Sequence, residues 1–444
     1  MSDVQTLSEL SPASRALFDM SGAATDLPGG DINWLTQLRE EALRRFGQAG
    51  LPTPKLEDWK YTDLKALNGA DLARRLGDTV AEADADFAPG VRHRLRFQDG
   101  CFAPGASSAD DLPKGVTLLP LRRALADMPD TLRAHLDQQD AGALSDLNAA
   151  YLDEGAVIIV DDTSDEDITL ALEFFTSDGG KVMPAFHPRN IIVVRKGART
   201  SLLERHGGEP DATYFANHVT TIALEDGASL NHVKEFGDPA GAFNTSLTQV
   251  RVGRDASYVS AILATGGQLL RNEIRIELAE EGAEAQLAGA YLGRGAQHTD
   301  HTTRIDHLAP NTTSRQIFRG ALDGNSRAVF QGNIVVADGA DGSDGRLAND
   351  TLLLTEGCEI DSKPQLEIYA DDVKCAHGST AGELDDEAMF YLRSRGVPEA
   401  EARAMLVEGF ISTVFEGIEE LSGIGELQNG IAKWLAGGNG SARP

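Results

Sequence analysis

The sequence predicts a mainly β protein in which a long array of short strands lies between two helical regions. From about residue 156 to about residue 380, β-branched runs such as VIIVDD, NIIVVRKGA and HVTTIALEDGA follow one another, and most end at Gly, Asp or Asn. A turn pattern also recurs at a near-constant step within this array. On either side of the array, apolar residues recur at helical spacing instead.

The first 155 residues are predicted to form a mixed helical domain. Residues 33–50 place apolar side chains on one helix face, at Leu35, Leu38, Ala42 and Phe46. Two prolines in LPTPKLEDWKYTDLKAL then end that helix, and its Trp59 and Tyr61 are expected to anchor a core or an interface. Further helices are expected around LRRALADMPDTLRAHL and ALSDLNAAYL, and short strands around LRFQDG and VTLLPL.

The turn pattern indicates a coil of stacked rungs over residues 156–380. A charged residue, a turn residue and an alanine stand together around positions 197, 227, 255 and 282, so the successive steps are 30, 28 and 27 residues. The pattern returns around Gly357, out of phase. A near-regular step made only of strands is typical of a solenoid. A β-sandwich is the alternative, although two-residue hairpin signals are scarce.

Helices are expected again from residue 381 to residue 444. Asp385 or Asp386 can cap a helix that ends near Gly396, and Pro398 suits the start of a second helix. The second helix is expected to bury an apolar face that includes Ala402, Met405, Leu406, Phe410 and Val414. Residues after Gly437 are expected to be disordered.

Composition argues against several classes of function. The chain has 69 Asp and Glu against 40 Lys and Arg, and its net charge of -29 disfavours nucleic acid or an anionic membrane as a partner. We expect no signal peptide, because the first residues show no basic stretch followed by an apolar core. We expect no membrane span, because no run of about 18 apolar residues occurs. Three widely spaced cysteines, Cys101, Cys358 and Cys375, do not suggest a disulfide framework and fit the reducing cytoplasm.

A cysteine and a histidine two residues apart form the main candidate site. In a strand, Cys375 and His377 would point to the same face, about 6.6 Å apart along it. A thiolate and an imidazole suit iron, zinc or a sulfur-bearing intermediate. The remaining ligands would have to come from elsewhere in this chain or from another chain. A buried thiol beside a hydrogen-bonded histidine, and a Cys/His hydrolase, are the alternatives.

A second polar cluster, QHTDHTTRIDH, also contains groups that could bind a metal: His298, Asp300, His301, Asp306 and His307. In a strand, His301 and His307 lie on one face and His298 on the other, so the three do not converge. We therefore expect solvated turn and strand positions here. No G-x-x-x-x-G-K-[ST] loop occurs, so any ATPase would have to be a partner.

Three segments resemble the SufB/SufD family, whose members are components of the Suf iron–sulfur cluster assembly machinery. They are EDWKYTDL (57–64), HTTRIDHLAPNTTSRQIFRGALDGNSRAVFQGNIVV (301–336) and PQLEIYADDVKCAHGSTAGELDDEAMFYLRSRG (364–396). The resemblance extends from about residue 51 to about residue 418. The CAHGST form, the short length and the absence of an N-terminal multi-cysteine motif resemble the SufD branch of the family rather than the SufB branch.

The resemblance implies a right-handed parallel β-helix core flanked by an N-terminal α/β domain and a C-terminal helical domain. It implies a non-catalytic subunit of a SufBCD scaffold complex that pairs with a SufB-like subunit. Cys375 and His377 would contribute ligands to a transient iron or iron–sulfur cluster at that interface, with no cofactor stably bound to the isolated chain. A SufC-like ABC ATPase would hydrolyse ATP and dock on the helical hairpin through Phe390, Tyr391, Leu392, Arg393 and Arg395.

Two other hypotheses remain at this point. A β-helix carbohydrate-active enzyme would use carboxylates clustered on a solvent groove. The lack of a secretion signal and the aromatic content of 6% argue against it, because sugar-binding platforms use Trp and Tyr. A SufB/SufD-like homodimer, formed by the chain alone and acting as a plain scaffold, is the other option.

Overall fold

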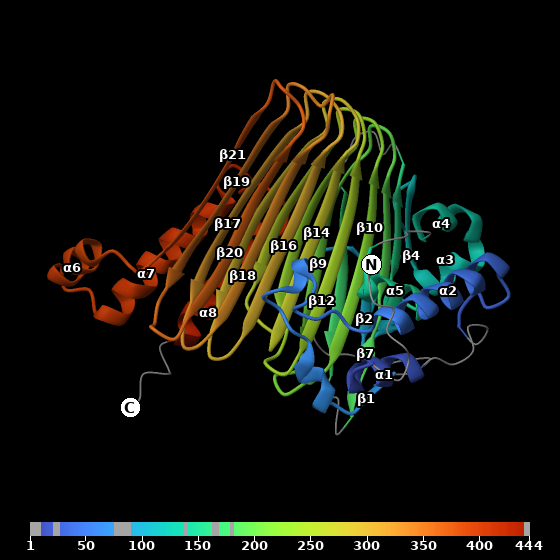
Figure 1. The fold of residues 1–444 in the computed structure, drawn as a ribbon, viewed down its shortest axis with the longest axis horizontal. Coiled ribbons are helices and arrows are strands. Elements are labelled where there is room, and N and C mark those ends of the chain that lie inside the picture. Colours follow the sequence, from blue (N-terminus) through green and yellow to red (C-terminus); the bar gives the residue numbers. More distant parts are fainter. Residues whose placement is uncertain are drawn as a thin grey trace.

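The computed structural model describes residues 10–20, 27–74, 90–136, 141–161, 168–177 and 182–438. Two long β-sheets run side by side along the molecule and enclose one shared core (Figure 1). Helices gather where the coil of strands begins and along one outer face of its later part. The protein is therefore mainly β with helical regions on both sides of the coil, as predicted.

Each sheet consists almost entirely of parallel strands, whose bounds follow in spatial order. Sheet A contains β20 (Glu359–Ile368), β18 (Arg327–Val336), β16 (His298–His307), β14 (Leu269–Leu278), β12 (Phe243–Val252), β10 (Phe215–Leu224), β8 (Arg189–Val194), β5 (Ala156–Val160) and β4 (Val116–Pro120), with β1 (Leu72–Arg74) and β7 (Met183–Phe186) beside this path. Sheet B contains β21 (Lys374–Gly382), β19 (Asp344–Leu353), β17 (Thr313–Leu322), β15 (Glu284–Gly293), β13 (Ser257–Ala264), β11 (Ser229–Gly237), β9 (Arg199–Gly208), β6 (Ile168–Thr176), β2 (His93–Gln98) and β3 (Cys101–Phe102).

From β8 onward the chain alternates between the sheets, so each strand pairs in parallel with the strand two positions later. The register aligns Arg199, Ser229, Ser257 and Glu284 across β9, β11, β13 and β15. These positions are separated by the 30, 28 and 27 residues that the turn pattern predicts. The parallel β-helix core is confirmed, and the β-sandwich alternative is wrong.

The recurring turn has a simple backbone explanation. Its turn residue adopts a left-handed backbone, with φ of 71° at Gly197, 66° at Gly227, 52° at Asp255 and 72° at Gly282. Glycine and aspartate tolerate this region better than most residues. The alanine that follows is buried in every case, at Ala198, Ala228, Ala256 and Ala283. The out-of-phase copy around Gly357 lies at the opposite edge, between β19 and β20.

The core of the coil is filled by alternate side chains of both sheets, such as Leu230, Ile274 and Phe330. It also holds a charged group, because the Glu204 carboxylate lies 2.7 Å from His206, 2.9 Å from His232 and 3.3 Å from Lys234. Burial alone would raise the pKa of Glu204, but Lys234 and the two histidines hold that pKa well below its usual value.

The N-terminal helices are α1 (Pro12–Asp19), α2 (Asn33–Ala49), α3 (Leu121–Asp127), α4 (Pro129–Leu136) and α5 (Ala143–Ala150). The helices α2 to α5 match the predicted helical patches, whereas α1 was not predicted. The strands β2 and β4 match the two predicted strands. Leu35 of α2 and Leu121 of α3 pack against Ile191 and Val193 on the outer face of β8. The first end of the coil is closed further by antiparallel pairing of β4 with β5 and of β3 with β2.

The C-terminal helices are α6 (Asp386–Ser394), α7 (Glu399–Ser412) and α8 (Ile424–Gly438). Asp385 caps α6, as one of the two predicted caps, by accepting backbone N–H groups of Glu387 and Ala388. The helices α7 and α8 pack on the outer face of sheet B, whereas α6 extends away from it (Figure 1). The segment after Gly438, where disorder is expected, lies outside the described residues.

The buried face of α7 differs from the prediction, and α8 was not predicted. The helix α7 buries Ala402, Val407 and Ile411, whereas the predicted core residue Met405 is 47% exposed. Leu427 and Ile431 of α8 complete the apolar layer against sheet B. In the part of the chain that the structure describes, no helix combines the length and the apolar character needed to cross a membrane.

Candidate functional site

The coil ends in an open rung formed by β20 and β21. Within the described residues, β20 pairs only with β18 and β21 pairs only with β19, so each strand has a free edge (Figure 1). Almost every side chain of β21 is exposed, in contrast to the buried strands before it. We call this pair of strands the last rung.

The last rung carries both predicted ligand residues on its inner face. Cys375 lies beside Gly345 and His377 beside Leu347, a buried residue of the coil core. Because neighbouring strands in register share their faces, both side chains point into the open mouth between the sheets. The prediction that they share one face of a strand is confirmed. Cys375 is half-buried and packs against the core, whereas His377 is exposed.

The surroundings of Cys375 favour the neutral thiol. Its partial burial raises the pKa of the thiol, and a backbone hydrogen bond from Gly345 only partly offsets this effect. A thiolate is the form that binds metals, so ligation by Cys375 requires the loss of a proton.

The chain supplies an incomplete ligand set at this rung. Among the residues that the structure describes, no group of three or more His, Cys, Asp or Glu side chains is placed to hold a metal ion. The next inward side chains are hydroxyls, and Ser379 donates a 2.7 Å hydrogen bond to Ser362 across the two sheets. A metal at Cys375 and His377 would therefore need ligands from outside this rung.

The second predicted cluster lies on β16, and the expectation that it is solvated is wrong. His301 and His307 point into the core with Ile305, and burial lowers the pKa of each imidazole to about 4. Both Nδ1 and Nε2 of His307 are engaged, by Thr312 and Ser314 at 2.8 Å. The cluster is split between two faces, as the spacing predicts, and it forms no metal site.

The outer half of that cluster is covered by residues 52–64, which we call the crossing segment. It contains the 3-10 turn η3 (Glu57–Trp59). The other 3-10 turns in the described part of the chain are η4 (Lys65–Gly69), η5 (Pro104–Ala106) and η6 (Thr413–Phe415). Thr62 donates to buried Asp300 and lies 3.0 Å from His298. The segment then reaches later rungs, because Gln331 donates to the Asp58 carbonyl and Lys363 pairs with Glu57. It thus connects the N-terminal region with β20.

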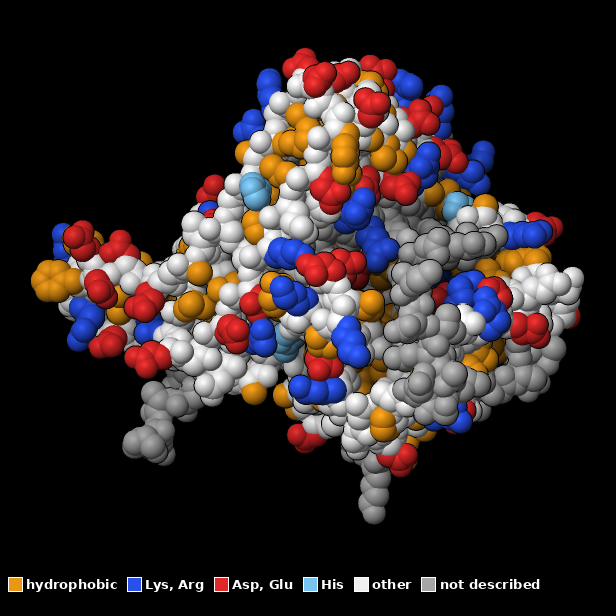
Figure 2. Space-filling view, in the orientation of Figure 1, with side chains coloured by type: hydrophobic (Ala, Val, Ile, Leu, Met, Phe, Trp, Pro, Cys, Tyr) orange, Lys and Arg blue, Asp and Glu red, His pale blue; other side chains and the backbone are white. Residues whose placement is uncertain are grey.

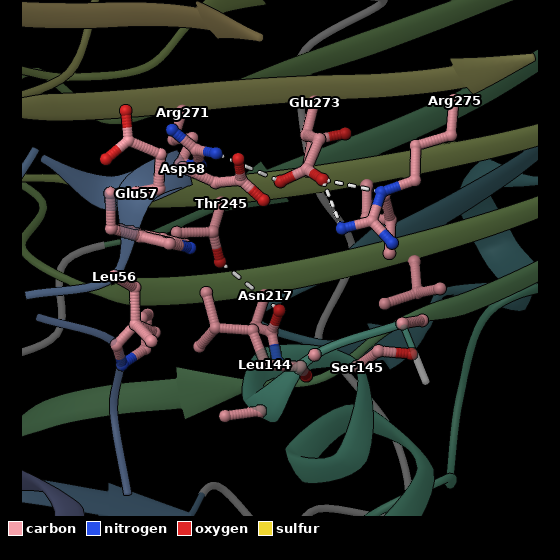
Figure 3. A pocket seen from close by; sticks show the side chains of 18 residues that line it. Leu56, Glu57, Asp58, Leu144, Ser145, Asn217, Thr245, Arg271, Glu273 and Arg275 are labelled. Atoms are coloured by element: carbon pink, nitrogen blue, oxygen red, sulfur yellow. Dashed lines mark hydrogen bonds and ion pairs between the residues drawn. The ribbon is translucent and has the colours of Figure 1, made fainter. Parts of the chain in front are cut away.

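A cavity of about 240 Å³ lies between the crossing segment, the start of α5 and the outer face of β10, β12 and β14. Figure 3 shows Glu273 between Arg271 and Arg275 along its wall. Arg271 pairs in addition with Asp300. These carboxylates already balance both guanidinium charges, so the described wall offers no unpaired positive charge to a ligand.

The five predicted docking residues lie together on α6 and at its end. Phe390 is 75% exposed and Tyr391 is 56% exposed, and Figure 2 shows hydrophobic side chains at the tip of this projecting helix. Arg395 lies over the Tyr391 ring, 4.8 Å from its centre, and Arg393 pairs with Glu399 at 3.4 Å. Two exposed aromatic side chains beside arginines are typical of a protein-binding surface.

Comparison with known proteins agrees with this architecture. Residues 174–410 match the family model "SUF system FeS cluster assembly, SufBD core domain", and residues 20–171 match "SufBD protein N-terminal region". The chain is 29% identical over 387 residues to the iron–sulfur cluster assembly protein SufD of Escherichia coli. This alignment covers 86% of this chain and 88% of the relative.

Two further relatives span most of the chain. The SufBD family protein slr0076 of Synechocystis is 28% identical over 418 residues, covering 91% of this chain and 92% of the relative. The chloroplastic protein ABCI7 of Arabidopsis thaliana is 24% identical over 395 residues, covering 86% and 82%. With matches to both family models and over nearly its whole length, the chain belongs to the SufB/SufD family of iron–sulfur cluster assembly proteins.

Proposed function

We propose that this chain is a SufD-like scaffold subunit of a SufBCD-type complex in the cytoplasm. Its last rung pairs with a SufB-like subunit, and its α6 docks a SufC-like ATPase. The single observation that carries the proposal is the open rung, whose inner face presents Cys375 and His377 and whose strands both have a free edge. The similarity to SufD of Escherichia coli supports the choice of branch.

A free strand edge is suited to pairing with another β-solenoid. Unpaired backbone N–H and C=O groups along β20 and β21 can extend both sheets into a second chain. Such stacking would cover the exposed side chains of the rung and bring a partner's residues next to Cys375 and His377. Iron and sulfide are the cargo in this proposal, and the partner supplies the remaining ligands.

The chain itself performs no ATP hydrolysis in this proposal. ATP-driven movement of the ATPase would act on α6, which projects from the coil and contacts it through α7. That movement would be transmitted to the last rung, because β21 ends at Gly382 and α6 begins only at Asp386. Membership of an assembly family disfavours the alternative of a carbohydrate-active enzyme.

The test is to co-express this chain anaerobically with its SufB-like and SufC-like partners and to measure iron and sulfide in the purified complex. We expect His377→Ala to lower both contents strongly while the three subunits still co-purify. Lys374→Ala is the matched control, because Lys374 is exposed on the same strand but points to the opposite face. Unchanged iron and sulfide in an intact His377→Ala complex would remove the ligand role.

A further inference from the structure

A chain of hydrogen bonds reaches the last rung from inside the core. The hydroxyl of Tyr291 on β15 donates to the side-chain carbonyl of Asn349 on β19 at 2.8 Å. The Asn349 amide donates to Ser362 on β20 at 3.3 Å, and Ser379 on β21 donates to Ser362 at 2.7 Å. Tyr291 and Asn349 are fully buried, whereas the two serines belong to the open rung. These hydrogen bonds therefore link a buried part of the core to both strands of the last rung.

This series of hydrogen bonds fixes the two strands of the last rung relative to each other. Ser362 and Ser379 lie on different sheets, so their hydrogen bond spans the mouth of the coil. Among the described residues, each strand has a neighbour on one side only, and none of its side chains is buried. Ser379 stands two residues after His377 and faces the same way, so anchoring its hydroxyl restrains the strand segment that carries the imidazole.

The core is shaped around the Tyr291 side chain. A Cβ at Gly320 on the neighbouring strand β17 would come within 2.0 Å of the Tyr291 ring, so glycine at that position is required for this placement. Burial raises the pKa of the phenol above its usual value, which keeps the hydroxyl protonated as a donor. Its second contact is a 2.6 Å hydrogen bond with Thr351, which leads no further toward the open rung.

We propose that Tyr291 and Asn349 are positioning residues for the candidate site. Through Ser362 and Ser379 they hold the inner face of the last rung in the geometry that presents Cys375 and His377 to a partner. The presentation of these two side chains rests on the proposed function, whereas the positioning of the rung can be measured on the isolated chain.

The experiment compares three conservative variants of the full chain in a Cys101→Ala, Cys358→Ala background that leaves Cys375 as the single thiol. Tyr291→Phe removes the hydroxyl that starts the chain. Thr351→Val removes the hydrogen bond between Thr351 and the Tyr291 hydroxyl, and it leaves the hydrogen bonds from Tyr291 through Asn349 to the two serines in place. Tyr258→Phe removes a buried phenol of the same kind, which bonds His232 at 3.1 Å far from the last rung. It therefore controls for general loss of stability.

Two readouts report on the last rung: amide hydrogen exchange of residues 359–368 and 374–382, and the reaction rate of Cys375 with an aromatic disulfide reagent. We expect Tyr291→Phe to raise both rates about tenfold, because the rung loses one buried hydrogen-bonded anchor. Thr351→Val and Tyr258→Phe should leave both rates within about twofold of the parent.

Equal rates in Tyr291→Phe and Tyr258→Phe would overturn the positioning role. The result is separable from that of the proposed function. If His377→Ala leaves iron and sulfide unchanged while Tyr291→Phe still loosens the last rung, the ligand role fails and the positioning role stands. If Tyr291→Phe has no effect on the rung while His377→Ala abolishes assembly, the reverse holds.

Discussion

The guanidinium of Arg271 lies 4.2 Å from the centre of the Trp59 ring, which joins the N-terminal region to the outer face of β14. The same guanidinium pairs with Asp300 and, at 3.2 Å, with Glu273. Thr62 also donates to Asp300. The expectation that Trp59 anchors an interface is confirmed within the chain itself, because the ring packs on a buried ion pair beneath the crossing segment.

Removing Asp300 should destabilise the protein strongly. Asp300→Asn leaves the buried Arg271 cation with only one carboxylate and should lower the free energy of unfolding by about 3 kcal/mol. The control is Asp306→Asn on the same strand, where a half-exposed Arg304 makes the pair and the expected loss is about 0–1 kcal/mol. Denaturant unfolding of both variants gives the comparison. Equal losses would show that the buried network has no special weight.

Glycine at position 289 should be required for core packing. A Cβ there would lie 2.3 Å from the Phe318 ring, so Gly289→Ala should cost about 1–3 kcal/mol of stability through overpacking. Gly378→Ala on β21 is the matched change, since a Cβ at that position meets no atom within 4 Å. Thermal unfolding should show a lower midpoint only for the first variant. A normal midpoint for Gly289→Ala would mean that the coil widens to accept the methyl group.

Stability should fall as the pH decreases from about 6.5 toward 4. Burial lowers the pKa of His187 to about 3 and that of His301 and His307 to about 4. In this pH range the unfolded chain therefore binds protons at these histidines that the folded chain does not bind. Glu154 opposes this trend, because burial raises its pKa to about 7 and the folded state already holds that proton. For these four groups alone the balance near pH 5 is about two protons, or about 2.7 kcal/mol per pH unit. His218, whose pKa burial lowers well below its usual value, adds to the same trend.

A single substitution tests this pH dependence. His301→Gln should reduce the slope of unfolding free energy against pH by about 1.1 kcal/mol per unit between pH 4.5 and 6. Denaturant titrations at several pH values in this range provide the slopes for the parent and the variant. Equal slopes for the parent and the variant would show that His301 has the same pKa in the folded and the unfolded chain.

The aromatic side chains of α6 should matter for binding and not for folding. Since Phe390 and Tyr391 are exposed, replacing both with Ser should change the stability of the isolated chain by less than about 0.5 kcal/mol. Binding of the SufC-like ATPase should weaken about 100-fold or more, measured by calorimetry, if these residues are hot spots. Ile411→Ala gives the contrast, because it removes a buried contact of α7 and should destabilise the chain by about 2–5 kcal/mol.

Binding that is unchanged in the Phe390→Ser, Tyr391→Ser variant would move the docking surface elsewhere. That other surface would not include the residues that pack α7 and α8 on sheet B, because Ile411 and Trp434 are buried within this chain. Loss of binding together with loss of folding would contradict the exposed position of α6.

The sequence predicts the coil well because its turns follow local rules. The backbone at Gly197, Gly227 and Gly282 needs a residue that tolerates positive φ, and the same backbone recurs at Asp255 and Asn311. The shared face of Cys375 and His377 follows from the two-residue period of any strand. These features depend only on neighbours in the chain.

Features that depend on distant segments could not be read in this way. Asp300 and His298 look solvated in sequence, but the crossing segment covers them from more than 200 positions earlier. His301 and His307 carried a usable signal, because they share their face with Ile305, a core residue. The buried face of α7 was missed because apolar side chains occur all round that helix, so periodicity does not select one side.

The two ends of the coil are unlike each other, and this difference limits how copies can add together. Short antiparallel strands and helices block the beginning, whereas β20 and β21 offer parallel edges at the finish. A solenoid with two open ends could stack without limit into a fibre. In the part of the chain that the structure describes, end-to-end joining through β20 and β21 uses up both of these edges, so growth from this end stops once two molecules have met.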